Sequence, residues 1–153
     1  MQVNERYKNE MKLQFSSIPS NVAFARVSVA AFASQLDFTL ADLEEIKVAV
    51  SEAVSNSIIH GYENASNRFV KVYAALSNDA IEIKIEDDGK GIKDINRALQ
   101  PTFSTDVERL GLGFVFMQSF MDGFEVESAP GKGTVVKMRK RVGTRMTQTN
   151  PEQ

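Results

Sequence analysis

The chain has 153 residues, of which 42% are hydrophobic, and it carries a formal net charge of −2. This length suffices for one domain with its own core, and the near-neutral charge provides no overall electrostatic footprint for nucleic acid or an anionic membrane. The lack of cysteine and the single histidine exclude disulfides and multi-histidine or thiolate metal sites, and without an apolar run of ~18 residues or a signal peptide we expect a cytoplasmic protein.

The first half of the chain is predicted to form a strand followed by two helices. Residues 11–15 alternate apolar and polar side chains, which is typical of a strand. A turn signal and apolar residues at helical spacing predict the first helix within residues 19–36. Thr39 with Asp42 forms a capping signal for the second helix, and Gly61 is placed to end it.

The second half of the chain is predicted to contain two hairpins with helices between them. Residues 69–76 and 80–86 are strand-like and are separated by a turn. The other predicted elements are a short helix at 94–99, a polar loop at 102–110, an apolar helix at 114–121, and strands at 124–128 and 134–141. This order favours an α/β (α+β) two-layer sandwich, in which a mixed, largely antiparallel sheet carries helices on one face. We assign the domain to residues 8–141 and expect flexible ends at 1–7 and 142–153.

The second helix is apolar on nearly all sides, which predicts that it is buried. Within it, Glu52 and Asn56 are four residues apart and share one face. Burying a carboxylate and an amide is unfavourable unless each meets a partner, water or a ligand. We therefore expect this face to line a cleft, where the pair can orient a hydroxyl and hold a hard cation. The alternative is that the two side chains form the solvated edge of the helix.

An acidic, glycine-containing string follows the strand at 80–86. It comprises Asp87, Gly89 and Gly91 in the pattern D-x-G-x-G. Glycines here allow positive φ and a close approach of the backbone to a ligand. Asp87, at a strand end beside a cleft, can accept a hydrogen bond from an exocyclic amine; the alternative is a loose acidic turn.

A second glycine pair, Gly111 and Gly113, is predicted to precede the apolar helix. Such a loop presents free N–H groups and the positive end of the helix dipole to phosphate. Residues 103–109 carry hydroxyls and one cation, which suits a lid that folds over a polyphosphate. The last string, at 131–134, is interpreted mainly as a hairpin turn, although Thr134 is placed to reach a ligand.

The joint order of these signals is more specific than any one of them. A Glu-x3-Asn helix, then D-x-G-x-G, then a lid ending in G-x-G, then G-x-G-T resembles the boxes of the GHKL (Bergerat-fold) ATPases. The strings SEAVSNSIIHGY and FARV (24–27) and the lid segment that begins at Pro101 are similar to those of the anti-sigma F factor family. Members of that family are sporulation anti-sigma factors with serine kinase activity. The resemblance covers roughly residues 8–141.

The resemblance implies a role for each matching residue. Glu52 matches the general base that activates the attacking hydroxyl, and Asn56 matches the magnesium ligand. Asp87 matches the aspartate that binds the adenine amino group. Arg26 matches an arginine that contacts both the sigma factor and the anti-anti-sigma substrate. The matches expected in the ATP site are Asn56, Asp87, Gly89, Gly91, Thr105, Arg109, Gly111, Gly113 and Thr134. His60 has no catalytic duty in this interpretation.

The function implied by the resemblance is that of a bifunctional regulator. It would bind ATP and Mg2+, sequester a sigma factor, and phosphorylate a serine of its anti-anti-sigma antagonist. The resemblance also implies a homodimer, for which the first strand is a candidate interface as an open sheet edge, and it implies no direct contact with nucleic acid or membrane.

Two alternative functions stay open at this point. One is a nucleotide-responsive sigma-binding module without kinase activity, but a module without chemistry does not need the carboxylate of Glu52. The other is a stand-alone catalytic domain of the histidine-kinase type. Only about 45 residues precede the buried helix and the sole histidine lies within it, so that interpretation requires a separate partner chain.

Overall fold

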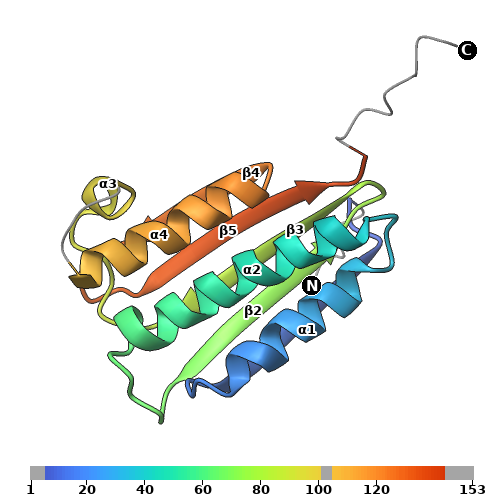
Figure 1. Ribbon diagram of the computed structural model, residues 1–153. Coiled ribbons are helices and arrows are strands. Elements are labelled where there is room, and N and C mark those ends of the chain that lie inside the picture. Colours follow the sequence, from blue (N-terminus) through green and yellow to red (C-terminus); the bar gives the residue numbers. More distant parts are fainter. Residues whose placement is uncertain (1–5, 101–104, 144–153) are drawn as a thin grey trace, which may run out of the picture.

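The computed structural model describes residues 6–100 and 105–143, with side chains in the second range from residue 110 onward (Figure 1). Its elements follow in chain order: β1 (Asn9–Ser16), α1 (Asn21–Ala33), α2 (Leu40–Asn56), the π-helical turn η1 (Ser57–Gly61), β2 (Phe69–Leu76), β3 (Ala80–Asp87), α3 (Ile95–Ala98), α4 (Thr105–Phe120), β4 (Gly123–Ser128) and β5 (Thr134–Arg141). The predicted flexible ends lie largely outside the described residues. Within the described part of these ends, Tyr7 donates a hydrogen bond to Glu82, and the Val142 amide donates one to the Asp79 carbonyl at 2.7 Å.

The five strands form one sheet in the order β1-β2-β3-β5-β4, and every described pair is antiparallel. The alternation of apolar and polar side chains fixes this register, since a slip by one residue would turn the apolar set away from the helices. Val70, Val72, Ile83 and Ile85 are buried as the alternation requires. The predicted two-layer fold is confirmed, and the sheet is antiparallel throughout its described strands rather than mixed.

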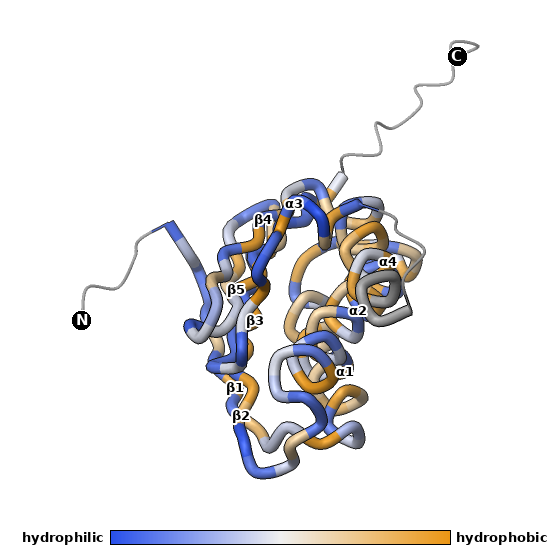
Figure 2. Tube along the Cα trace, turned by 90° about the vertical axis from the view of Figure 1, so that its left-hand side faces the viewer, coloured by the Kyte–Doolittle hydropathy of each residue, from blue (hydrophilic) through white to orange (hydrophobic). Residues whose placement is uncertain are grey.

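Three helices cover one face of the sheet, and α2 lies between α1 and α4 (Figure 1). Viewed from the side, the strands form one layer and the helices the other (Figure 2). The capping box that Thr39 and Asp42 predict is present: the Asp42 amide donates to Thr39 Oγ1 at 3.0 Å, and the Thr39 amide donates to Asp42 Oδ2 at 3.1 Å. The apolar side chains of α2 fill the centre of the core. Among the described residues, no helix combines the length and the apolar composition that a membrane crossing needs.

The structure also contradicts the predicted loop at 102–110 from residue 105 onward, because α4 begins at Thr105 and not after the second glycine pair. Gly111 and Gly113 therefore lie inside the helix, and their N–H groups do not form its free N-terminal donors. A glycine inside a helix costs about 1 kcal/mol relative to alanine. Close packing explains why they are accommodated, since a Cβ at Gly111 would lie 3.1 Å from the Gln100 carbonyl oxygen. The part of the predicted lid segment at 101–104 lies outside the described residues.

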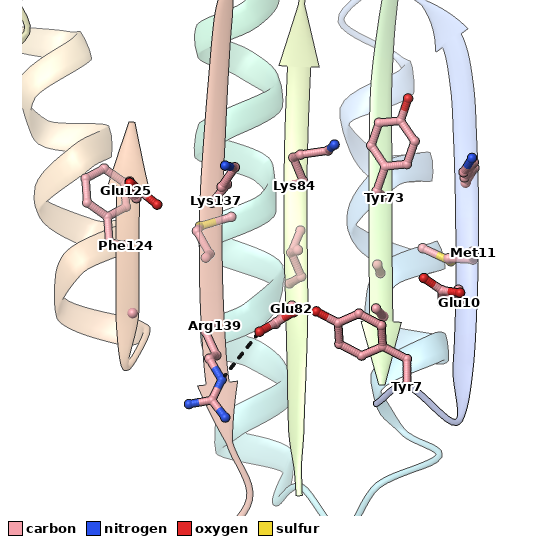
Figure 3. A pocket seen from close by; sticks show the side chains of 16 residues that line it. Tyr7, Glu10, Met11, Tyr73, Glu82, Lys84, Phe124, Glu125, Lys137 and Arg139 are labelled. Carbon is pink, nitrogen blue, oxygen red and sulfur yellow. Dashed lines mark hydrogen bonds and ion pairs between the residues drawn. The ribbon is translucent and has the colours of Figure 1, made fainter. Parts of the chain in front are cut away.

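The face of the sheet opposite the helices bears charged and tyrosine side chains and is hollowed by about 1120 Å3 (Figure 3). Glu82 at its centre forms ion pairs with Arg6 at 3.3 Å and with Arg139 at 3.8 Å. The ammonium of Lys84 lies 4.4 Å from the centre of the Tyr73 ring. The charges on this face are largely matched by their neighbours, which is typical of a solvated surface.

Lys140 is a buried cation that joins the two layers. It lies on β5 with its side chain 8% exposed. Its Nζ donates to Glu45 Oε2 on α2 at 2.8 Å and to the Phe120 carbonyl at the end of α4 at 2.6 Å. Removing one member of such a buried pair leaves the other member without its partner.

We expect Lys140→Met to lower the free energy of unfolding by about 1–3 kcal/mol, because Glu45 and the Phe120 carbonyl lose their donor. Urea unfolding measures the change. The matched control is Lys137→Met on the same strand, where the pair with Glu127 is exposed to solvent and contributes little to stability. Equal unfolding free energies for the two variants would contradict the role assigned to Lys140.

Candidate functional site

The candidate site lies at the end of the helical layer, where the chain leaves α2 and β3. A cavity of about 410 Å3 opens there. It is lined by residues of α2, η1, the turn after β3, α4 and β5, among them Asn56, Asp87, Gly91 and Thr134. Four residues that the sequence predicts for one site, from three distant parts of the chain, thus share a cavity. The larger hollow on the opposite face contains none of them.

Glu52 and Asn56 lie one helical turn apart on α2 and point toward the same residue of α4. A Cβ built on Gly113 would lie 3.1 Å from Glu52 Oε2 and 3.0 Å from Asn56 Nδ2. Any larger residue at 113 would press on both side chains, so the glycine permits α4 to lie against them. Partial burial raises the pKa of the Glu52 carboxyl above its ordinary value. The carboxylate is therefore a stronger proton acceptor than an exposed glutamate.

Asn56 lines the cavity and has an amide with spare hydrogen-bonding capacity. Its Nδ2 is buried and has no hydrogen-bond partner among the described residues. A buried donor of this kind is rare in proteins and requires a physical explanation. The Nδ2 atom lies on the side of Asn56 that faces Gly113 of α4, and a ligand oxygen that reached it would satisfy the amide.

Asp87 is the one acidic residue among the described residues that line the cavity, and 4% of it is exposed. Burial raises the pKa of its carboxyl, while hydrogen bonds from the Gly89 amide, at 2.9 Å from Oδ1, and from the Ser57 hydroxyl act in the opposite direction. These donors stabilise the ionised carboxylate. A buried carboxylate held in this way is an acceptor for an amino group that enters the cavity.

Glycines are required around Asp87 because backbone segments pass in contact there. A Cβ on Gly89 would lie 2.2 Å from the Gly61 carbonyl oxygen, and a Cβ on Gly61 would lie 2.8 Å from Asp87 Oδ1. Gly91 and Gly133 adopt φ of 74° and 73°, which confirms the expected positive φ at the first of these.

The remaining sequence-predicted residues are placed as follows. Thr105 lies at the start of α4 and Arg109 in its first turns, but their side chains are outside the described part of the structure. Gly113 faces Glu52 and Asn56 rather than lining the cavity. Arg26 lies on α1 and is not among the residues of the cavity.

Sequence reasoning missed three residues that hold the site together: Ser57, Gly61 and Tyr62. Ser57 donates to Asp87, and Gly61 packs on the Asp87 carboxylate. The Tyr62 hydroxyl accepts a hydrogen bond from the turn that follows Asp87. All three belong to or follow the π-helical turn, a feature that is often found at functional sites. The signal in the sequence that pointed to them was Asp87 itself, because a carboxylate at the end of a buried strand needs hydrogen-bond donors nearby. His60, which the sequence interpretation left without a duty, also lines the cavity.

The donor set is compatible with a metal ion only in the company of a ligand. Within the described residues, no group of three or more His, Cys, Asp or Glu side chains is arranged to hold a metal ion. Mg2+ is commonly held by one or two protein oxygens together with water and substrate phosphates. The amide oxygen of Asn56, beside the carboxylate of Glu52, fits that arrangement.

A family model described as the histidine kinase-like ATPase domain matches residues 15–140 of the chain. The anti-sigma F factor of Thermoanaerobacter sp. (strain X514) is 53% identical over 140 residues, which cover 90% of this chain and 97% of the relative. The anti-sigma F factor of Oceanobacillus iheyensis is 51% identical over 145 residues, which cover 94% of this chain and 99% of the relative. These matches extend over nearly the whole length of both proteins.

Solved structures show the same fold at low sequence identity. The RsbU and RsbW domains of a Mycobacterium tuberculosis protein superpose with a TM-score of 0.61 at 15% identity. That match covers 88% of this chain and 32% of the other. The histidine kinase domain of a blue-light activated histidine kinase from Erythrobacter litoralis gives a TM-score of 0.51 at 20% identity, covering 67% of this chain and 45% of the other.

Proposed function

The chain belongs to the anti-sigma F factor family of histidine kinase-like ATPases, and we propose that it is a bifunctional regulator of transcription. It sequesters a sigma factor and, with Mg2+ and ATP, phosphorylates a serine of its anti-anti-sigma antagonist. Such a regulator acts in the cytoplasm. The observation that carries the proposal is the convergence of Asn56, Asp87 and Thr134 on one cavity, with Glu52 one turn from Asn56.

Asp87 is the group that selects the base of the nucleotide. Its buried carboxylate accepts a hydrogen bond from the amino group of adenine, whereas guanine presents a carbonyl oxygen at the corresponding position. Burial makes a mismatch costly because an acceptor facing another acceptor loses its water without gaining a partner. The cavity therefore favours ATP over GTP.

Asn56 would hold the phosphate end of the nucleotide and Mg2+ through its amide, whose Nδ2 has no hydrogen-bond partner among the described residues. When bound, Mg2+ neutralises charge on the phosphate oxygens. Gly91 and Thr134 line the same cavity, and we assign Gly89, Thr105, Arg109, Gly111 and Gly113 to the nucleotide site through the family resemblance.

Glu52 is the general base of the transfer step. Its carboxylate accepts the proton of the substrate serine while the serine oxygen bonds to the γ-phosphorus. The bond from that phosphorus to the bridging oxygen breaks, and ADP leaves with the electron pair. Since burial raises the pKa of Glu52 toward the operating pH, it matches the requirement for an efficient base.

Arg26 supplies the partner surface on α1. Two neighbouring apolar side chains are exposed, Phe24 at 51% and Val27 at 58%. An arginine beside exposed apolar residues is typical of the energetically dominant part of a protein interface. We place the sigma factor and the anti-anti-sigma protein here. We also expect a homodimer. Its candidate interface is β1, which is an edge strand of the sheet.

We expect Arg26→Ala to weaken sigma-factor binding at least tenfold while ATP affinity is unchanged, because Arg26 lies outside the cavity. Calorimetric titration of the sigma factor in the presence of Mg-ATP measures the loss. Arg141→Ala, an exposed arginine on β5, is the control and keeps wild-type affinity. Unchanged sigma-factor binding in Arg26→Ala would remove this surface from the proposal, and no binding by the wild-type chain would reject the anti-sigma role.

A further inference from the structure

Tyr62 is a buried tyrosine whose hydroxyl bridges two strands beside the nucleotide cavity. It follows the π-helical turn and is 6% exposed. Its Oη donates to the Phe69 carbonyl at the start of β2, at 2.5 Å, and accepts from the Asp88 amide just after β3, at 2.8 Å. The hydroxyl therefore makes both of its bonds to backbone groups and fixes the distance between them.

Three consecutive amides after Asp87 are held by specific acceptors. The Asp88 amide donates to Tyr62, the Gly89 amide to the Asp87 carboxylate at 2.9 Å, and the Lys90 amide to the Gly61 carbonyl at 2.9 Å. Two of these acceptors belong to the segment that ends the helical run. The Tyr62 hydroxyl is the side-chain acceptor among them that lies outside the turn, and it anchors the turn together with the Gly61 carbonyl.

Arg68 braces the same point from the solvent side. Its Nη2 donates to the Asp88 carbonyl at 2.9 Å, and its guanidinium carbon lies 4.9 Å from the centre of the Tyr62 ring. Both backbone polar groups of Asp88 are thus hydrogen-bonded. Its amide donates to Tyr62, and its carbonyl accepts from Arg68. The side chain of Asp88 itself is exposed, so these contacts act on its backbone.

We propose that Tyr62, braced by Arg68, is a positioning residue for adenine recognition. It holds the backbone after Asp87 so that the carboxylate, which takes its own hydrogen bond from Gly89, faces the base. This inference rests on the proposed function of the cavity. Tyr62 thereby contributes to the affinity and selectivity for the base, and it takes no part in the transfer step at Glu52.

The test is the kinetics of Tyr62→Phe, which removes only the hydroxyl. We expect the KM for ATP in phosphorylation of the anti-anti-sigma protein to rise about tenfold, as loss of a bond to a buried donor implies. The kcat at saturating ATP stays within twofold of wild type. The ratio of kcat/KM for ATP to kcat/KM for GTP falls. Tyr73→Phe is the matched control, because its ring lies on the opposite face of the sheet. That variant keeps wild-type KM.

Arg68→Met is the second variant, chosen because Arg68 is exposed and its replacement does not disturb the core. We expect a rise of about threefold in the KM for ATP, since an exposed bond contributes less than a buried one. An unchanged KM for ATP in both variants overturns the inference. It is also overturned if kcat falls by the same factor as kcat/KM, because the KM is then unchanged and the effect lies in the transfer step. A KM in Arg68→Met equal to wild type overturns it if Tyr62→Phe does not fold. A wild-type chain that does not bind ATP by calorimetry instead rejects the proposed function of the cavity.

Discussion

Glu52→Ala is expected to lower the rate of phosphoryl transfer about 1000-fold, the typical contribution of a general base. The ATP affinity should stay within about threefold of wild type, because Glu52 is not among the residues that line the nucleotide cavity. Single-turnover transfer from labelled ATP measures the first quantity and calorimetry the second. A parallel loss of ATP binding would make Glu52 a structural residue.

The matched control for this change is Glu44→Ala on the same helix, an exposed glutamate that pairs with Lys47. It should transfer phosphate at the wild-type rate. The pH dependence provides a further check on Glu52. Because burial raises the pKa of its carboxyl, the base becomes protonated at a higher pH than an exposed glutamate does. Transfer should therefore decline on the acid side of neutrality, and Glu52→Gln should abolish that limb of the profile.

Asp87→Asn is expected to weaken ATP binding about 10- to 100-fold, the penalty that follows when a buried polar contact is mismatched. Asparagine preserves the size of the side chain and one oxygen for the Gly89 amide. Its NH2 group replaces the second carboxylate oxygen, so a donor faces the amino group of adenine. Calorimetric titration with ATP measures the change.

The control is Asp88→Asn, the neighbouring residue, whose side chain is exposed. It makes the same change of charge and should bind ATP as the wild type does. Undiminished ATP affinity in Asp87→Asn would remove Asp87 from the nucleotide site. Equal weakening in both variants would point instead to the general charge of the turn.

The sheet could be predicted from the sequence because its signals are local. The alternation over Phe69–Leu76 and Thr134–Arg141 specifies strands with one buried face, and the structure has those bounds. The capping box at Thr39 likewise depends on residues only three apart. Glu52 and Asn56 were recognisable as a pair because they share one face in the middle of a helix that is apolar on nearly all sides, where polar groups need a partner.

The N-terminal part of α4 could not be predicted in the same way, because distant contacts decide it. Two glycines and a polar stretch locally favour a loop. The packing of Gly113 against Glu52 and Asn56 depends on a residue about 60 positions earlier in the chain, and no local pattern reports it. The same holds for Tyr62, whose bond to the Asp88 amide spans 26 positions. Local rules fail here where tertiary contacts build the site.

The most direct test of the central claim is a phosphoryl-transfer assay. The wild-type chain and Glu52→Ala are incubated with γ-labelled ATP and Mg2+, with and without the anti-anti-sigma protein, and the labelled residue is identified by mass spectrometry. The account predicts label on a serine of the antagonist with the wild-type chain and none above background with Glu52→Ala. Tight binding of ATP by the wild-type chain without any labelled serine would contradict the kinase assignment and leave a nucleotide-responsive binding module.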